Sequence, residues 1–402
     1  MLVLKSRTSQ NVVILAACRT AIAKFGRSFV GVNPTRLGSV VVSESIAKTG
    51  MKPKNVEKVI MGNAIQAGLG PNPARQASIY AGLPIATEAV TVNESFASGL
   101  ESVVMGMQAI RSGDADIVVA GGMESMSGAP YLERYARWGA KFGDVRGQDG
   151  MIIDGLWDPS GNYHFGILGE HIARKFGVTR QKADEFAFES NMKAASTQKE
   201  GGFDREVVKV QIEREMGDVL SYEKDECIRP NTTLEALSKL KPVFKPGGIL
   251  TAGNSSQLAD GAAVLVLASE TKAASLGVKP LARVLSHDFA GTRWENAMEA
   301  PIRAVESLLS QTGLSVDSID LYECDEMYST ASVALRDKIG IPKERFNIHG
   351  GSIALGDPIG CSGARILTTL VHSLTLSNKK TGLAASAGAG GNAVAILVET
   401  TS

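Results

Sequence analysis

Residues 90–110 have the sequence VTVNESFASGLESVVMGMQAI. Small residues at positions 97–99 form a tight turn, and the apolar residues after it recur at helical spacing: Leu100, Val103, Val104, Met107 and Ile110. Many enzymes place a nucleophile where a strand enters such a turn, because the helix N-terminus favours negative charge. The residue just before this turn is Phe96, which has no nucleophilic atom. The segment therefore predicts a strand, turn and helix of an enzyme-like α/β fold without the usual reactive side chain.

The composition indicates a soluble globular α/β protein of two or three domains. The chain has 402 residues, of which 44% are hydrophobic, 21% are charged and 43 are glycine. The 42 Lys and Arg residues balance the 42 Asp and Glu residues, so the net charge is zero. Because no overall positive field would attract polyanions, we expect no nucleic-acid partner.

The cysteines and the N-terminal segment bear on the compartment. Four cysteines lie far apart with no CxxC pairing, which argues against a disulfide framework or a zinc site: Cys18, Cys227, Cys324 and Cys361. We expect no metal and no resident cofactor. No apolar run approaches the roughly 18 residues of a membrane span, so we expect no membrane association. The opening residues 1–15 are short for a transit peptide, which favours the cytoplasm, with a mitochondrion or another organelle as the alternative.

Two parts of the chain share one order of elements. The first has predicted strands at 11–20, 56–65 and 115–122, a helix at 35–49 and the unit at 90–110. The second has strands at 280–290, 319–328 and 382–399, a helix at 300–311 and a glycine-rich turn and helix at 346–367. Internal duplication explains this correspondence, and alternating strands and helices imply parallel or mixed sheets covered on both faces.

A stretch of different character separates these halves. It has many charges and few clear strands, and we interpret it as an inserted loop domain over the mouth of the core. The expected division is a first half at 1–124, a loop domain at 125–249, a strand and helix of the first half at 250–276, and a second half at 277–402.

Five segments in this order resemble the thiolase family, the acyl-CoA acetyltransferases that make or cleave 3-ketoacyl-CoA. They are RTAIAKFGRSF (19–29), PNPARQA (71–77), VAGGMESMSGAPY (119–131), RPNTTLEALSKLKPVFKPGGILTAGNSSQLADGAA (229–263) and GGSIALGDPIGCSGARIL (350–367). The resemblance implies a five-layered αβαβα fold from two duplicated halves plus a loop domain that helps to bind coenzyme A. It also implies a homodimer or tetramer.

The four residues on which that family's chemistry depends are replaced in this chain. The cysteine of N-x-x-C-x-S-G, which takes the acyl group, corresponds to Phe96. The histidine of G-H-P-x-G, which activates that cysteine, corresponds to Asp357. The asparagine of N-E-A-F corresponds to Asp325, and the second cysteine, of C-x-G-G-G, corresponds to Ala387. An ionised aspartate has no proton to donate to an oxyanion, so on this reasoning Asp357 cannot replace the histidine.

The substitutions lead to one main functional hypothesis and two alternatives. The main one is a catalytically degenerate thiolase homologue that binds a CoA ligand or serves as the inactive partner of an active thiolase. The first alternative is a repurposed enzyme that acts on a CoA thioester or a 1,3-dicarbonyl compound through Asp325, Glu326, Asp357 and His349. The second is a structural subunit with a vestigial pocket.

Coenzyme A binding is a separate expectation from catalysis. By the resemblance, Ser256 contacts the pantetheine arm, and His164, Phe165 and Gly390 also line the CoA site. Gln257 stands where a glycine is common in the family. We expect acyl-CoA or CoA as the ligand.

Overall fold

The computed structural model describes residues 10–139, 141–213 and 218–401. Residues 1–9, which contributed to the expected location, lie outside the described residues. Within the described part of the chain, no helix is both long and apolar enough to cross a membrane.

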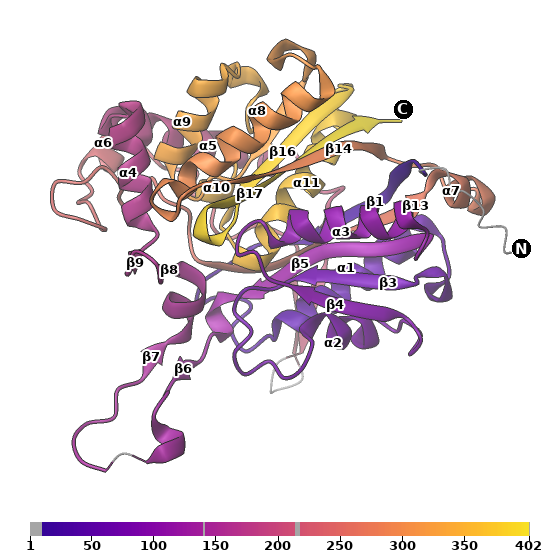
Figure 1. Cartoon of the computed structure of the whole chain (residues 1–402), viewed down its shortest axis with the longest axis horizontal. Helices are drawn as coiled ribbons and strands as arrows, with labels where there is room; N and C mark the ends of the chain where they lie inside the picture. The colour runs from indigo at the N-terminus through magenta and orange to yellow at the C-terminus, as the bar shows by residue number, and fades with distance from the viewer. Residues whose placement is uncertain (1–9, 140, 214–217, 402) are drawn as a thin grey trace, which may run out of the picture.

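Two groups of strands, one from each half of the chain, form the sheets (Figure 1). The first group lies in the order β1 (Val12–Thr20), β13 (Ala259–Ser269), β5 (Ile117–Ser125), β3 (Lys58–Gly62) and β4 (Glu88–Val92). The second lies in the order β15 (Leu321–Cys324), β16 (Thr381–Ala387), β17 (Asn392–Thr400) and β14 (Ala282–Gly291). A short antiparallel pairing of β1 with β14, in which Val12 faces Val284, joins the two groups.

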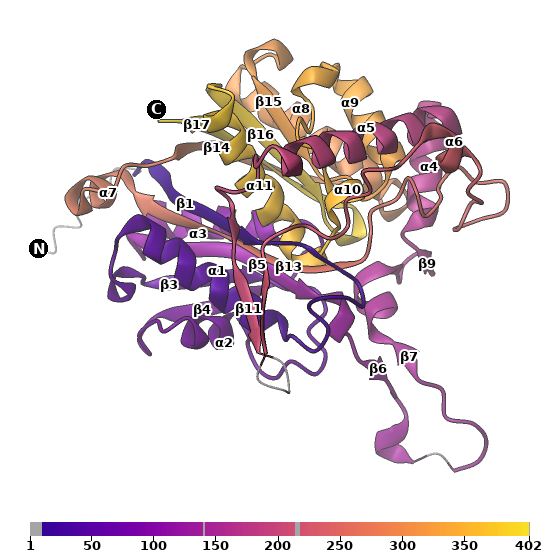
Figure 2. The same ribbon diagram turned by 180° about the vertical axis from the view of Figure 1, so that it is seen from behind.

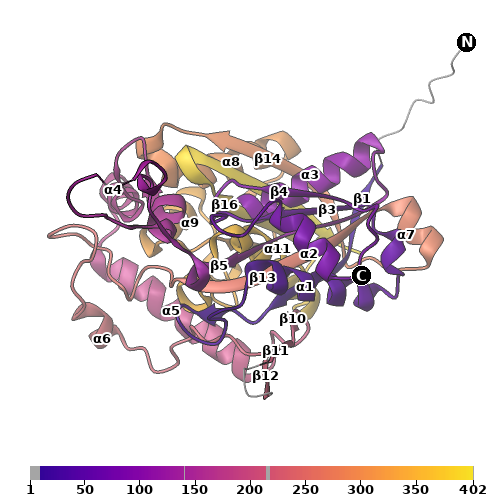
Figure 3. The ribbon, with the colours of Figure 1, turned by 90° about the horizontal axis from the view of Figure 1, so that it is seen from below.

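Helices complete the five layers. The central layer contains α3 (Ser98–Ser112) and α11 (Ile359–Leu376), and the outer layers contain α1 (Pro34–Thr49) and α2 (Pro73–Tyr80) on one side and α8 (Ala300–Thr312) and α9 (Ser329–Ile339) on the other (Figures 1 and 3). Strands β1, β5 and β13 are buried along their whole length because helices cover both of their faces. This arrangement confirms the predicted layered α/β fold.

The two central helices approach to backbone contact. A Cβ at Gly363 would lie 2.5 Å from the backbone nitrogen of Leu100, and a Cβ at Gly99 would fall against the backbone nitrogen of Ala364. Glycine is therefore required at both positions. The close approach brings the turn before α3 and the turn before α11 into one region of the core.

The helices in the middle of the chain pack against the core, whereas the short strands at 131–132 and 148–149 lie in an arm that projects away from it (Figure 2). These helices are α4 (Gly166–Phe176), α5 (Arg180–Lys199) and α6 (Leu234–Ser238). The short strands of this middle part form the pairs β6 (Tyr131–Leu132) with β7 (Gln148–Asp149), β8 (Trp157–Asp158) with β9 (Tyr163–His164), and β11 (Val210–Glu213) with β12 (Val219–Tyr222). Two further short strands extend the main sheet, β2 (Ala23–Lys24) beside β13 and β10 (Val207–Val208) beside β1. The remaining short helices are α7 (Glu270–Leu276) and α10 (Ser352–Leu355).

One predicted element differs from the structure. Residues 382–399, expected as a single strand, form the antiparallel hairpin of β16 and β17. The chain reverses at Gly390 and Gly391, whose φ angles of 68° and 98° are available to glycine without strain. The run of small residues that suggested a continuous strand contains the turn itself.

Candidate functional site

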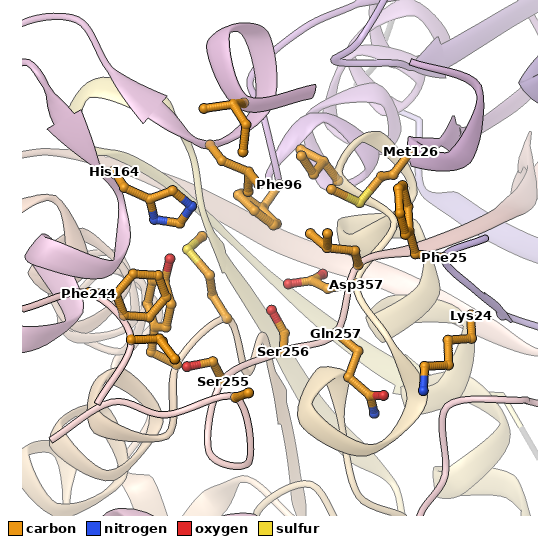
Figure 4. A pocket seen from close by; sticks show the side chains of 18 of the residues that line it. Lys24, Phe25, Phe96, Met126, His164, Phe244, Ser255, Ser256, Gln257 and Asp357 are labelled. Carbon is orange, nitrogen blue, oxygen red and sulfur yellow. The ribbon is translucent and has the colours of Figure 1, made fainter. Parts of the chain in front are cut away.

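A pocket of about 440 Å³ opens where the loop region meets both halves of the core. Side chains from all three parts line it, including Phe96, Met126, His164, Phe244, Ser256 and Asp357 (Figure 4). Most of the lining is apolar, with a few polar groups, as is usual for a site that binds small organic molecules.

The turn before α3 places an apolar side chain in the wall of this pocket. Phe96 is only 2% exposed, and its ring forms part of the pocket wall. The turn is held by the Ser98 hydroxyl, which accepts from the backbone N–H of Glu94 at 2.8 Å and donates to the carbonyl of Ser95 at 2.5 Å. The Ser95 hydroxyl is buried outside the pocket lining, so it is not a displaced nucleophile.

The turn before α11 presents a carboxyl group. Asp357 is 3% exposed, and its backbone N–H donates to the carbonyl of Gln257 at 2.9 Å. Its Oδ1 accepts a hydrogen bond from the Ser362 hydroxyl, whereas Oδ2 has no hydrogen-bond partner among the described residues. Figure 4 shows the Asp357 carboxyl facing into the pocket near Ser256. An unpartnered buried oxygen is a costly feature that a ligand could relieve.

The protonation state of Asp357 corrects the expectation made from its charge. Burial, and then the neighbouring Asp325, raise the pKa of Asp357 from 3.8 to about 8, although the Ser362 hydroxyl, Arg365 and the Ser256 hydroxyl act in the opposite direction. At pH 7 the carboxyl group is therefore mostly neutral and has a proton to donate. The expectation that Asp357 cannot serve an oxyanion assumed the ionised form, and the raised pKa removes that assumption.

Asp325 lies behind Asp357 and forms a pair with it. Its Oδ1 accepts from the Ser352 hydroxyl at 2.7 Å, and that hydroxyl accepts from the Arg365 guanidinium at 2.8 Å. Arg365 also forms an ion pair with Glu323 at 3.1 Å. Burial raises the pKa of Asp325, and Ser352 and Arg365 oppose that rise. Since Ser352 donates to Asp325, Ser362 donates to Asp357, and burial raises the pKa of both carboxyl groups, the two titrate as a coupled pair.

The other two members of the predicted acid–base group lie elsewhere. Glu326 accepts from Ser190 at 2.7 Å and from Asn347 at 2.8 Å. His349 bonds to Thr197 at 3.0 Å through Nδ1. Neither Glu326 nor His349 lines the 440 Å³ pocket. The structure thus brings Asp325 to Asp357 and leaves Glu326 and His349 outside the pocket.

Two of the four predicted CoA-binding residues line the pocket. His164 and Ser256 belong to the lining, whereas Phe165 is buried at the start of α4, and Gly390 lies in the turn between β16 and β17. The His164 ring stacks on Phe244 with centroids 4.9 Å apart, and burial lowers its pKa. The imidazole ring of His164 is therefore neutral and forms a flat part of the pocket wall.

Ala387 and Asp325 border a separate cavity of about 20 Å³.

The 440 Å³ pocket also has lining residues that were not identified from the sequence, namely Lys24, Phe25 and Ser255. Gln257, which also lines it, was noted only as a replaced glycine. The available signal for Ser255 and Gln257 was their place in residues 229–263, one of the segments that carry the family resemblance. In the described ranges, no group of three or more His, Cys, Asp or Glu side chains is arranged to hold a metal ion.

Comparison with known proteins gives one family for nearly the whole chain. The family model described as "Thiolase, N-terminal domain" matches residues 12–271, and "Thiolase, C-terminal domain" matches residues 278–400. The acetyl-CoA acetyltransferase of Cupriavidus necator is 43% identical over 97% of this chain and 99% of its own length. A probable acetyl-CoA acyltransferase of Staphylococcus aureus is 42% identical over 96% of this chain and 98% of its own. The crystal structure of the Bacillus anthracis acetyl-CoA acetyltransferase has a TM-score of 0.96 and 34% identity, and it covers 98% of this chain and 100% of its own.

These relatives overturn the main functional hypothesis. A catalytically degenerate CoA binder or inactive partner does not agree with relatives that are similar over almost their full length and are named as enzymes. The alternative of a structural subunit with a vestigial pocket is not tested by these comparisons and stays a prediction. The matching domain models and these full-length relatives together show that the chain belongs to the thiolase family.

Proposed function

We propose that this chain is an enzyme that acts on an acyl-CoA thioester or a related 1,3-dicarbonyl compound, with Asp357 as the acid–base residue. The observation that supports this most directly is the neutral, buried Asp357 with an unpartnered Oδ2 in the main pocket. Perturbed titratable groups in a largely apolar pocket are typical of catalytic sites. The relatives' names supply the class of substrate.

The proposed chemistry needs no covalent intermediate at position 96. A substrate carbonyl oxygen placed against Asp357 Oδ2 receives a hydrogen bond from the neutral carboxyl group as negative charge develops on that oxygen. Water or the thiol of free CoA adds to the 3-keto carbon, and the bond between C2 and C3 then breaks. The departing carbon takes the proton of Asp357, and Asp357 recovers a proton from the attacking nucleophile, so the carboxyl group ends in its starting state.

Asp325 acts in this scheme as a positioning residue. Its negative charge, held by Ser352 and Arg365, keeps the proton on Asp357. The arrangement matches the general pattern in which two nearby carboxyl groups have different roles because their surroundings separate their pKa values.

The test is turnover of acetoacetyl-CoA by the purified protein, with and without free CoA, with an acyclic 1,3-diketone as a second substrate. We expect Asp357→Asn to lower kcat/KM by about 10²–10⁴-fold, because general acid–base catalysis contributes an effect of that size. The matched control is Glu344→Gln, an exposed carboxyl group far from the pocket lining, for which we expect unchanged turnover.

Two results would contradict the proposal. The first is an absence of turnover with every one of these substrates. The second is equal turnover by the wild type and Asp357→Asn. Intact mass of the quenched protein adds an independent readout, since we expect no acyl adduct on the chain.

We also infer a homodimer or tetramer, as the family resemblance implies, in the cytoplasm, which the widely separated cysteines favour. Light scattering after size-exclusion chromatography distinguishes these states from a monomer, and a monomer would contradict the inference.

A further inference from the structure

The pocket extends to both sides of Asp357. Figure 4 shows His164, Phe244 and Ser255 on one side, and Lys24, Phe25 and Gln257 on the other. The first side contains His164, one of the two lining residues that the resemblance assigns to the CoA site. The second side has no role in the chemistry described above.

Gln257 is held rigidly on this second side. Its Nε2 donates to the carbonyl of Cys227 at 2.8 Å and to the carbonyl of Ile353 at 3.2 Å. Two carbonyl acceptors around one end of the amide require the nitrogen there, so Oε1 must occupy the other end. The backbone carbonyl of Gln257, as distinct from its side-chain amide oxygen, accepts from the backbone N–H of Asp357, which fixes the two residues side by side.

The amide oxygen of Gln257 is left without a partner. The residue is 8% exposed, and Oε1 has no hydrogen-bond partner in the part of the chain that the structure describes. A buried acceptor without a donor is unfavourable, so a ligand that brings an O–H or N–H group to this place gains affinity that an apolar ligand does not.

We infer that Gln257 is a specificity-determining residue that recognises a hydrogen-bond donor on the acyl group, so that the enzyme prefers hydroxylated or amide-bearing acyl-CoA substrates over plain alkyl ones. This inference rests on the proposed function, which places a substrate carbonyl against Asp357. With the pantetheine arm on the His164 side, the acyl group extends toward Gln257. Phe25 and Met126 provide apolar walls there, and Gln257 provides an unpaired acceptor.

The test compares the binding of two ligands that differ by one acyl hydroxyl, 3-hydroxybutyryl-CoA and butyryl-CoA. Neither has a 3-keto group, so neither undergoes the proposed cleavage between C2 and C3, and chromatography of the recovered ligand verifies that it is intact. Isothermal titration calorimetry gives both Kd values. For the wild type we expect 3-hydroxybutyryl-CoA to bind about 3–10-fold more tightly, the effect of one hydrogen bond.

Two variants locate the origin of that preference. Gln257→Leu keeps a similar volume without an acceptor, and we expect its Kd ratio to fall to about one. Gln181→Leu makes the same change at an exposed position of α5 outside the pocket lining, and we expect the wild-type ratio. Thermal denaturation of each variant verifies that it is folded.

The outcomes separate this inference from the proposed function. If neither 3-hydroxybutyryl-CoA nor butyryl-CoA binds the wild type, the proposed function fails. If both bind with equal Kd values, the proposed function stands and the Gln257 inference fails, as it would if the Lys24 ammonium already supplied the donor. If Gln257→Leu weakens both esters equally, the amide contacts the pantetheine arm, and the inference is again wrong.

Discussion

The turn before α3 and the turn before α11 are the two counterparts that meet at the centre of this molecule. Each leads into a central helix, and each helix has a glycine pressed against the backbone of the other. The first turn presents Phe96, a ring without reactive atoms, and the second presents Asp357, a carboxyl group with a free oxygen. The difference indicates that the framework of the site is separable from its chemistry. The same packed pair of helices holds one turn as a wall of the pocket and the other as its acid.

The largest expected effect is on the contact that holds the two turns together. Gly99→Ala places a methyl group against the backbone of Ala364, which cannot move without displacing α11. We expect a loss of about 4 kcal/mol or more in the free energy of unfolding, measured by urea denaturation. Gly291→Ala is the matched control, because nothing lies within 4 Å of a Cβ at that position, and a change within about 0.5 kcal/mol is expected. Similar stability of both variants would show that the helices do not meet as described.

The next effect tests the first turn as a wall. Phe96→Ala removes a buried ring and enlarges the pocket, and we expect a loss of about 3 kcal/mol in the free energy of unfolding. Phe96→Leu restores most of the apolar volume and should lose about 1 kcal/mol. Were the alanine variant as stable as the wild type, the ring would not be packed in the core.

The third prediction tests the second turn through the pH dependence of stability. The folded-state pKa of Asp357 lies above its ordinary value of 3.8, so ionisation costs the folded protein nothing below pH 3.8 and progressively more up to about pH 8. Asp357→Asn cannot ionise and escapes this cost. Relative to the wild type, the variant should therefore gain stability progressively between pH 4 and pH 8, by at most about 1.4 kcal/mol for each pH unit. Parallel stability profiles for the two proteins would mean that Asp357 titrates normally.

The smallest effect concerns the residue behind the acid. Ser352→Ala removes a donor from Asp325 and favours the neutral form of that carboxyl group. With less charge at Asp325, the pKa of Asp357 falls. In the wild type the rate should decrease as the pH rises through about 8, where Asp357 loses its proton. In Ser352→Ala the fall in rate should occur about half to one pH unit lower. If the two proteins turn over equally at pH 6 and their rates fall at the same pH, Asp325 is excluded as a positioning residue.

Local pattern was sufficient to predict the layered fold and the two turns. Helical spacing after the turn at 97–99, the repeated order of elements and the glycine-rich turn before residue 359 are all local or periodic signals. The motifs of the family resemblance placed Phe96 and Asp357 at the site, and both line the pocket. The hairpin at residues 382–399 was not predicted, because a run of small residues has no period that separates a strand from a turn.

The side chains of Asp325 and Glu326 show where sequence alone was insufficient. They are adjacent in the chain and were grouped together, but Asp325 bonds to Ser352 beside Asp357, whereas Glu326 bonds to Ser190 and Asn347 away from the pocket. Which neighbours a side chain meets depends on how distant elements pack.

The amino-acid sequence by itself determined the architecture of this protein and the identity of the residues at its two central turns. Only the tertiary structure decided that Asp357 is a proton donor and not a fixed negative charge. The reason is that the pKa of a carboxyl group depends on its loss of water and on the charges around it. In this protein both come from segments far apart in the chain, and they meet only when the two halves pack together.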